Sequence, residues 1–280
     1  MGFPLVTTGW LADNLPNQNL VLLDASMSKV IGRTPRVYDE PVFIPGARQF
    51  DLERDFCDLN SPMIHAFPAE ERFTRQAQKL GIHRDSIVII YDNQGVYSAP
   101  RAWWIFQAMG HENTFVLDGG LPKWLAEQRE TVSGLARPSE TGSIVGALQS
   151  DRVCDSNYLL KELKAGQVTA IDARSAERFS GTAPEPREGV RSGHVPGSQN
   201  LPFAEVLDDH SFKSAEQLKV VFSNLLPPEN QQTVFSCGSG ITACIILMAA
   251  VIAGYENTVL YDGSWADWGS NPSLPVATSD

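Results

Sequence analysis

The chain has 280 residues, of which 42% are hydrophobic and 20% charged, an ordinary globular composition with room for two domains. Its 22 basic and 33 acidic residues give a formal net charge of −11 at neutral pH. The acidic excess, without a basic run interleaved with aromatics, argues against nucleic acid as a partner, and an anionic substrate would need a local cationic site.

Strand-length apolar runs alternate with helical stretches along the chain. In the first half we predict strands at 21–23, 87–91 and 115–117 and helices at 69–80 and 100–109. In the second half we predict strands at 170–172, 233–236 and 258–261 and helices at 215–222 and 242–253. Such alternation predicts a parallel sheet flanked by helices in each half, with any active site where loops leave the carboxyl ends of the strands.

The two halves repeat one order of motifs. HENTFVLDGGLPKW at 111–124 resembles YENTVLYDGSWADW at 255–268, which lies 144 positions later. Applied without gaps, this offset places Cys237 on Asn93, whose amide cannot replace a thiolate. A repeat of this length indicates domain duplication, because it is far longer than the repeat of a solenoid.

The duplication predicts three segments. We expect a first copy at 1–130 and a second copy at 152–280. Between them, residues 131–151 are rich in Ser, Gly and Thr and show little periodicity, which indicates a linker.

The four cysteines are spaced neither for a zinc site nor for a CxxC redox pair. The first residues lack the basic start and the continuous apolar run of a secretory signal. No apolar run reaches the roughly 18 residues that span a bilayer. We therefore expect a cytoplasmic protein with reduced thiols, without a metal, a cofactor or a membrane partner.

The motif CGSGIT carries the main chemical signal, because it stands between an apolar strand and an apolar helix. Gly238 and Gly240 allow a tight loop whose backbone N–H groups point inward, next to a helix N-terminus that favours negative charge. Cys237 heads this loop, so we predict that it is a thiolate nucleophile. Ile241 and Thr242 complete the predicted active-site loop.

A cysteine at the head of an anion-binding loop could also belong to a phosphatase. Cysteine phosphatases use the pattern C-x5-R, in which the arginine grips the phosphoryl oxygens. Six residues after Cys237 stands Ala243, so the loop fits one charged sulfur, a persulfide, better than a phosphoryl group. A buried structural cysteine is the alternative interpretation, and it fits Cys244 inside the apolar helix.

The motif CGSGITA resembles the C-G-S-G-[VI]-T-A loop of the 3-mercaptopyruvate sulfurtransferases, a family of the rhodanese superfamily. Further matching motifs extend over essentially the whole chain: SAPRAWW, LDGGLPKW, DARSAERFSG, EPREG, GHVPG and YDGSWADW. The resemblance implies two tandem rhodanese-like α/β domains, of which only the second is active. It also implies a small-molecule sulfur donor, a Cys237 persulfide, a thiol, thioredoxin-like or cyanide acceptor, and release of pyruvate.

The resemblance also implies that Arg178 and Arg187 bind the carboxylate of the donor, which the fork of a guanidinium suits. Ser239 could hydrogen-bond the substrate, relay a proton or cap the following helix. In this family a histidine often precedes I-P-G and has been proposed to form a triad with the loop serine. Phe43 stands there in this chain, so we expect no Ser-His-Asp triad, and we expect His194 in the second copy to be structural.

Two other functions stay open. A thiosulfate:cyanide sulfurtransferase would have the same fold, but such enzymes typically carry basic residues in the loop, where this chain has Gly238, Ser239 and Gly240. A non-catalytic rhodanese-like binding module would usually have lost the cysteine, which is present here. The roles of Tyr97 and Arg101 are not assigned by the sequence.

Overall fold

The computed structural model describes residues 2–226 and 231–279. By its internal contacts the chain divides into two compact units. Unit 1 consists of Met1–Asp58, Phe67–Gln149 and Asp209–Phe212, and unit 2 consists of Leu59–Ala66, Ser150–Asp208 and Lys213–Asp280. A short segment from the first half of the chain, 59–66, therefore belongs by its contacts to unit 2.

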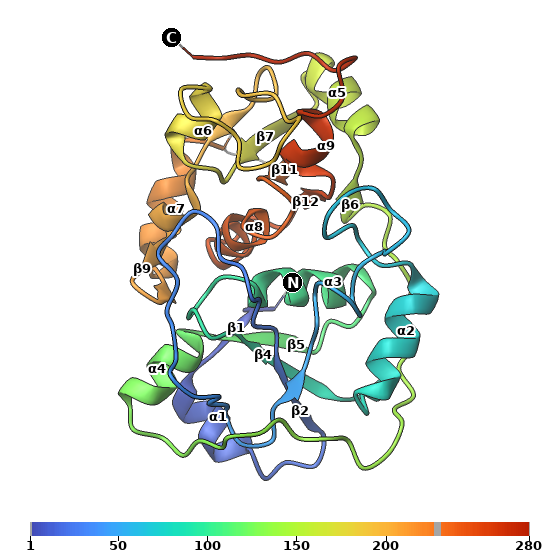
Figure 1. The fold of residues 1–280 in the computed structure, drawn as a ribbon, viewed down its shortest axis with the longest axis vertical. Coiled ribbons are helices and arrows are strands. Elements are labelled where there is room, and N and C mark those ends of the chain that lie inside the picture. Colours follow the sequence, from blue (N-terminus) through green and yellow to red (C-terminus); the bar gives the residue numbers. More distant parts are fainter. Residues whose placement is uncertain (1, 227–230, 280) are drawn as a thin grey trace. The chain divides into compact units, whose positions relative to one another are not determined.

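Unit 1 is built on a parallel sheet that, in the described part of the chain, has five strands in the order β1-β5-β4-β2-β3. Its elements run from blue to green in Figure 1. They are β1 (Leu5–Val6), α1 (Thr8–Asn14), β2 (Leu20–Asp24), β3 (Arg48–Gln49), α2 (Glu70–Lys79), β4 (Ile87–Tyr91), α3 (Ala99–Ala108), β5 (Thr114–Leu117) and α4 (Gly120–Ala126).

Unit 2 repeats this architecture with the strand order β6-β12-β11-β7-β8, also five strands among the residues described. Its elements are β6 (Val153–Cys154), α5 (Ser156–Lys164), β7 (Val168–Asp172), α6 (Ala176–Ser180), β8 (Gln199–Asn200), the 3-10 helix η1 (Phe203–Val206), α7 (Ala215–Ser223), β11 (Gln232–Ser236), α8 (Ala243–Ile252), β12 (Thr258–Tyr261) and α9 (Ser264–Trp268). A further short strand, β9 (Leu207–Asp208), lies in unit 2, whereas β10 (Ser211–Phe212) belongs by its contacts to unit 1.

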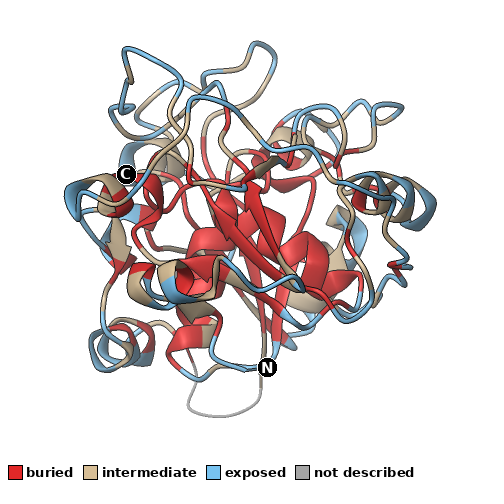
Figure 2. Ribbon diagram, turned by 90° about the horizontal axis from the view of Figure 1, so that it is seen from below, coloured by how far each residue is buried: buried red, intermediate tan, exposed pale blue. Residues whose placement is uncertain are grey.

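The central strands are buried because they are continuous apolar runs, as expected for a parallel sheet covered on its faces. Helix α8 is apolar on all sides and buried almost throughout, whereas α2 buries only Phe73 and Ala77. Figure 2 shows this contrast as a red interior of strands and inner helices within blue and tan outer segments. The predicted α/β class is confirmed, and no helix of the described residues is long and apolar enough to cross a membrane.

Matching registers reveal the duplication in three dimensions. Asp24 at the end of β2 pairs with Tyr91, and Asp172 at the end of β7 pairs with Ser236. Each unit also has an isolated antiparallel bridge near its end, and the bridged pairs are Phe43 with Val132 and His194 with Ala277. The two copies therefore share their strand order, their strand register and an antiparallel bridge near the end of each unit.

The segment predicted as a linker packs against unit 1 along most of its length. Ser143 N–H donates to the carbonyl of Ile82 at 3.0 Å, and Ala147 N–H donates to that of Met109 at 3.0 Å. Ile144 is 2% exposed. By contacts this segment belongs to unit 1 as far as Gln149, and the division into 1–130, 131–151 and 152–280 stays a prediction.

Candidate active site

The loop of unit 2 that leaves β11 is held by hydrogen bonds to the start of α9. Cys237 directly follows β11 and is 2% exposed. Its N–H donates to Oγ of Ser264 at 3.2 Å, and its carbonyl accepts from Trp265 N–H at 2.9 Å. The carbonyl of Gly238 accepts from Ala266 N–H at 3.0 Å. These hydrogen bonds hold the backbone before and after the side chain of Cys237.

Ser264 reaches this position through a rare backbone conformation. Its φ is 50°, in the left-handed region that disfavours residues with a Cβ, and it is fully buried. Its Oγ accepts from Cys237 and donates to the carbonyl of Tyr261 at 3.0 Å. The hydroxyl of this strained residue both accepts and donates a hydrogen bond. This indicates that Ser264 keeps its unfavourable backbone conformation because it positions the loop.

Both predicted arginines lie at the loop. The structure leaves no free space beside Gly238, because a Cβ there would lie 3.2 Å from Nη2 of Arg178 and 3.5 Å from Nη1 of Arg187. Gly240 has a φ of 80°, so the second loop glycine is needed for its backbone conformation. The two glycines thus serve different purposes: one admits the guanidinium groups and the other allows the turn.

The two arginines differ in their charge environment. Arg178 donates from Nε to Oε1 of Glu185 at 3.1 Å and also bonds the second carboxylate oxygen through Nη2. Within the described ranges, Arg187 has no carboxylate partner. Its positive charge is therefore uncompensated and close to Cys237, which suits an anionic ligand.

Ser239 contacts a histidine that the sequence did not single out. Its Oγ lies 3.2 Å from Nδ1 of His65, and Ser239 is 7% exposed. Helix α8 begins with Thr242 as its N-cap and has no side-chain cap, so Ser239 does not cap it. Of the three roles considered for this hydroxyl, the geometry favours contact with substrate or a proton relay.

The sequence does not point to His65, because the family's histidine precedes I-P-G, where Phe43 stands in this chain. His65 comes from the irregular segment SPMIHAFP and has a φ of 59°, which no local pattern predicts. The chain has only five histidines, so a count of them would have raised His65 as a candidate. His194, by contrast, stacks on Phe179 and bonds its carbonyl through Nδ1 at 2.8 Å.

The equivalent loop of unit 1 carries an aspartate at its head. Tyr91 ends β4 as Ser236 ends β11, and Leu121 N–H donates to the carbonyl of Asp92 as Trp265 N–H does to that of Cys237. Asp92, not Asn93, therefore corresponds to Cys237. The gap-free offset was wrong here because the stretch from strand to helix is one residue longer in unit 1.

Four backbone N–H groups surround the carboxylate of Asp92, which is fully buried. One oxygen accepts from Gln94 at 2.9 Å, and the other accepts from Tyr97, Ser98 and Ala99 at 2.8 to 2.9 Å. The loop and the N-terminus of α3 thus form an anion cradle that holds an internal carboxylate. By duplication, this supports the prediction that the loop of unit 2 holds a negative charge.

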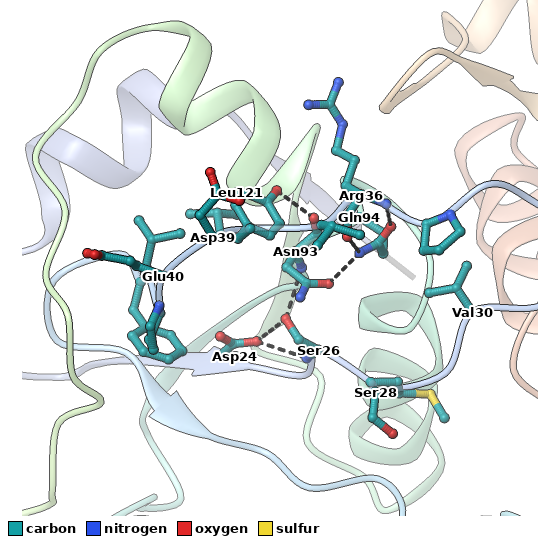
Figure 3. A pocket seen from close by; sticks show the side chains of 17 residues that line it. Asp24, Ser26, Ser28, Val30, Arg36, Asp39, Glu40, Asn93, Gln94 and Leu121 are labelled. Carbon is teal, nitrogen blue, oxygen red and sulfur yellow. Dashed lines mark hydrogen bonds between the residues drawn. The ribbon is translucent and has the colours of Figure 1, made fainter.

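Unit 1 has a cavity of about 490 Å³ beside this loop, at the carboxyl ends of β2 and β4 (Figure 3). Asp24 accepts from Ser26 N–H at 2.8 Å, and Ser26 Oγ accepts from Asn93 N–H at 2.9 Å. Gln94 bonds the backbone of Arg36 in both directions, at 2.7 and 3.1 Å. Neither a thiol nor an imidazole is among the described residues that line the cavity.

The other three cysteines lie in environments that disfavour a thiolate. Burial raises the pKa of the Cys57 thiol, and burial followed by the charges of Asp155 and Asp262 raises that of Cys154. Cys244 is fully buried in α8, and its thiol donates to the carbonyl of Gly240 at 3.3 Å.

Comparison with known proteins agrees with this architecture. The model of the rhodanese-like domain matches the chain twice, at 7–127 and 155–271. The 3-mercaptopyruvate sulfurtransferase of Rattus norvegicus is 39% identical over 94% of this chain and 91% of its own. A mitochondrial thiosulfate/3-mercaptopyruvate sulfurtransferase of Arabidopsis thaliana is 36% identical over 98% and 78%. Among solved structures, SseA of Escherichia coli, a 3-mercaptopyruvate sulfotransferase, superposes with a TM-score of 0.82 at 31% identity over 93% of this chain and 98% of its own.

Proposed function

Since the chain belongs to the family of proteins built from rhodanese-like domains, we propose that it is a sulfurtransferase that uses 3-mercaptopyruvate as its donor. One observation carries the proposal: Arg178 and Arg187 both lie against Gly238, the residue next to Cys237. A donor whose carboxylate bonds these arginines would present its sulfur close to the cysteine. We assign catalysis to Cys237 and Ser239 and carboxylate binding to the two arginines.

The transfer is a displacement at sulfur. The Cys237 thiolate attacks the sulfur of the donor, so that an S–S bond forms and the C–S bond of the donor breaks. The electron pair of that bond moves to the carbon side, which leaves as the enolate of pyruvate and takes up a proton. Inward backbone N–H groups and the N-terminus of α8 stabilise the negative charge on the loop sulfur.

The second half-reaction regenerates the enzyme. A thiol, a thioredoxin-like protein or cyanide attacks the outer sulfur of the persulfide, and the Cys237 thiolate leaves. The loop residues Gly238, Gly240, Ile241 and Thr242 keep their position in both half-reactions and supply backbone donors. The acceptor class is part of the proposal and is supported by the chemistry of a persulfide.

His65 and Ser239 provide a route for the proton. The imidazole contacts the hydroxyl at 3.2 Å, so a proton can pass between the donor thiol, Ser239 and His65. An imidazole thus contacts the loop serine although Phe43 stands where the family often has a histidine. Ser239 lies two positions after the nucleophile Cys237, so we expect its hydroxyl to reach a donor bound at the loop.

Intact mass after incubation with 3-mercaptopyruvate tests the proposal directly. We expect a gain of one sulfur atom that dithiothreitol removes. The Cys237→Ser variant should show no gain, whereas Cys57→Ser, which changes a cysteine of unit 1, should gain sulfur as the wild type does. A wild type that gains no sulfur would contradict the proposal and favour a non-catalytic binding module.

Thiosulfate is the competing donor, because one similar relative is named for both donors. The neutral loop residues Gly238, Ser239 and Gly240 favour the organic donor, since they add no positive charge that would suit a dianion. The ratio of kcat/KM for the two donors, with one acceptor at fixed concentration, decides between them. A ratio in favour of thiosulfate would replace the proposed donor without changing the role of Cys237.

A further inference from the structure

A buried network of four charged side chains stands behind the arginine site of unit 2. Arg174, fully buried, bonds Asp172 at the end of β7 with Nε at 2.9 Å and Nη2 at 2.6 Å. Its guanidinium also stacks on Trp265, 4.4 Å from the ring centroid. Burial opposes the charge of Arg174, but the carboxylates of Asp172 and then Glu185 outweigh it and raise its pKa above the ordinary value.

Glu185 links this network to the substrate site. Its Oε1 accepts from Nη1 of Arg174 at 2.8 Å and from Nε of Arg178 at 3.1 Å, and its Oε2 bonds Nη2 of Arg178. The Glu185 side chain is only 2% exposed. Two carboxylates therefore face two guanidinium groups, and the network as a whole is electrically neutral.

Arg187 lies outside this balance. Its Nη1 would be 3.5 Å from a Cβ on Gly238, and no carboxylate of the described residues pairs with it. Arg178 can still donate hydrogen bonds to a ligand, but its charge is already cancelled by Glu185. The arginine site beside Cys237 thus has two sets of donors and one uncompensated positive charge.

We propose that Glu185 is a specificity-determining residue that sets this site for donors with one negative charge. The inference rests on the proposed function and explains its choice of donor. 3-Mercaptopyruvate with a protonated thiol carries one negative charge, on its carboxylate, whereas thiosulfate carries two. On binding, the second negative charge of a dianion would be desolvated without meeting a second positive charge. A buried charge without a partner costs free energy, so the site disfavours binding of the dianion.

The variant Glu185→Gln tests the inference because it removes the charge and keeps the size and one acceptor oxygen. Arg178 then faces the loop with a net positive charge. We expect the ratio of kcat/KM for thiosulfate to that for 3-mercaptopyruvate to rise on the order of tenfold, the scale of one charge-assisted hydrogen bond. Partial misfolding lowers both kcat/KM values by the same factor. Their ratio therefore describes the folded protein, whatever fraction of the sample is folded.

Two matched variants separate charge from geometry. Glu188→Gln makes the same chemical change at an exposed position of the same segment and should leave the ratio unchanged. Glu185→Asp keeps the charge and shortens the side chain, so it should shift the ratio much less than Glu185→Gln. An equal shift in Glu185→Asp, or no shift in Glu185→Gln, would overturn the inference.

A binding measurement gives a readout that does not depend on turnover. Sulfate, a dianion, and acetate, a monoanion, can each be titrated for protection of Cys237 against iodoacetamide. In Glu185→Gln the concentration of sulfate needed for half-protection should fall on the order of tenfold relative to that of acetate. An unchanged sulfate-to-acetate ratio would refute the charge balance, whereas a wild type without persulfide would refute the proposed function instead.

Discussion

Nδ1 of His65 lies 3.2 Å from Oγ of Ser239, although 174 positions separate the two residues in the chain. His65 belongs to the short segment 59–66 that joins unit 2 by its contacts. Unit 2 therefore contains an imidazole that comes from the first half of the sequence. The loop itself, residues 237–242, contains no histidine, the side chain whose ordinary pKa lies nearest to neutral pH.

Removing either partner of this pair should slow the proton transfer. We expect His65→Ala and Ser239→Ala each to lower kcat/KM for 3-mercaptopyruvate by about 10- to 100-fold. The double variant should be little worse than either single variant, because the two residues act as a unit. His83→Ala is the control, and Phe43→His should give no gain. Wild-type turnover in His65→Ala would show that the contact is only structural.

Ser264 offers a test of how the loop is held. Ser264→Gly relaxes the left-handed backbone but loses the acceptor for Cys237 N–H, so we expect about a tenfold loss in kcat/KM with little change in Tm. Ser264→Ala loses the same hydrogen bonds and keeps the strain, so it should be the less stable of the two. If both variants turn over as the wild type does, the hydroxyl does not position the loop.

Asp92 should be a major source of stability for unit 1. Asp92→Asn places amide hydrogens against backbone N–H donors, and we expect it to lower the free energy of unfolding by about 3 kcal/mol. Hydrogen exchange at the amides of 97–99 should become faster. The control is Asp39→Asn, an exposed carboxylate at the same cavity. Equal stability of the two variants in urea would contradict the role of the cradle.

Alkylation should distinguish Cys237 from the other cysteines. At neutral pH we expect iodoacetamide to modify Cys237 first, because Arg178 and Arg187 lie at its loop, whereas burial raises the pKa of Cys57 and Cys154 and the thiol of Cys244 donates to the carbonyl of Gly240. Peptide mass spectrometry over time gives the order of modification. Faster labelling of Cys57 or Cys154 would show that their thiols are not protected as the structure indicates.

His111 should make the stability of the chain depend on pH. Burial lowers the pKa of His111, whose Nε2 lies 3.1 Å from the carbonyl of Ser86. Below pH about 6.5 the unfolded chain takes up a proton that the folded histidine resists, so the free energy of unfolding falls as the pH drops. In His111→Gln we expect this fall between about pH 7.5 and 5.5 to shrink by about 1 kcal/mol. A slope equal to that of the wild type would contradict this, and His83→Gln is the control.

The sequence predicted the repeated α/β architecture because apolar strands and helices alternate with a clear local signal. It also indicated the loop, since the glycines around Cys237 stand directly between a strand and a helix. It could not predict His65, whose place at the loop depends on tertiary contacts of an irregular segment. Nor could it align Asp92 with Cys237, because one extra residue in the loop is visible only from the strand register.

The carboxylate of Asp92 also bears on how the two copies differ. An anion site built from backbone N–H groups tolerates substitution of its side chains, because the main chain supplies the donors. In unit 1 the side chain of Asp92 takes all four of these donors, so a bound anion would have to displace it. The geometry of such a site can therefore be recognised from the backbone even where the side chain at the head of the loop is not a cysteine.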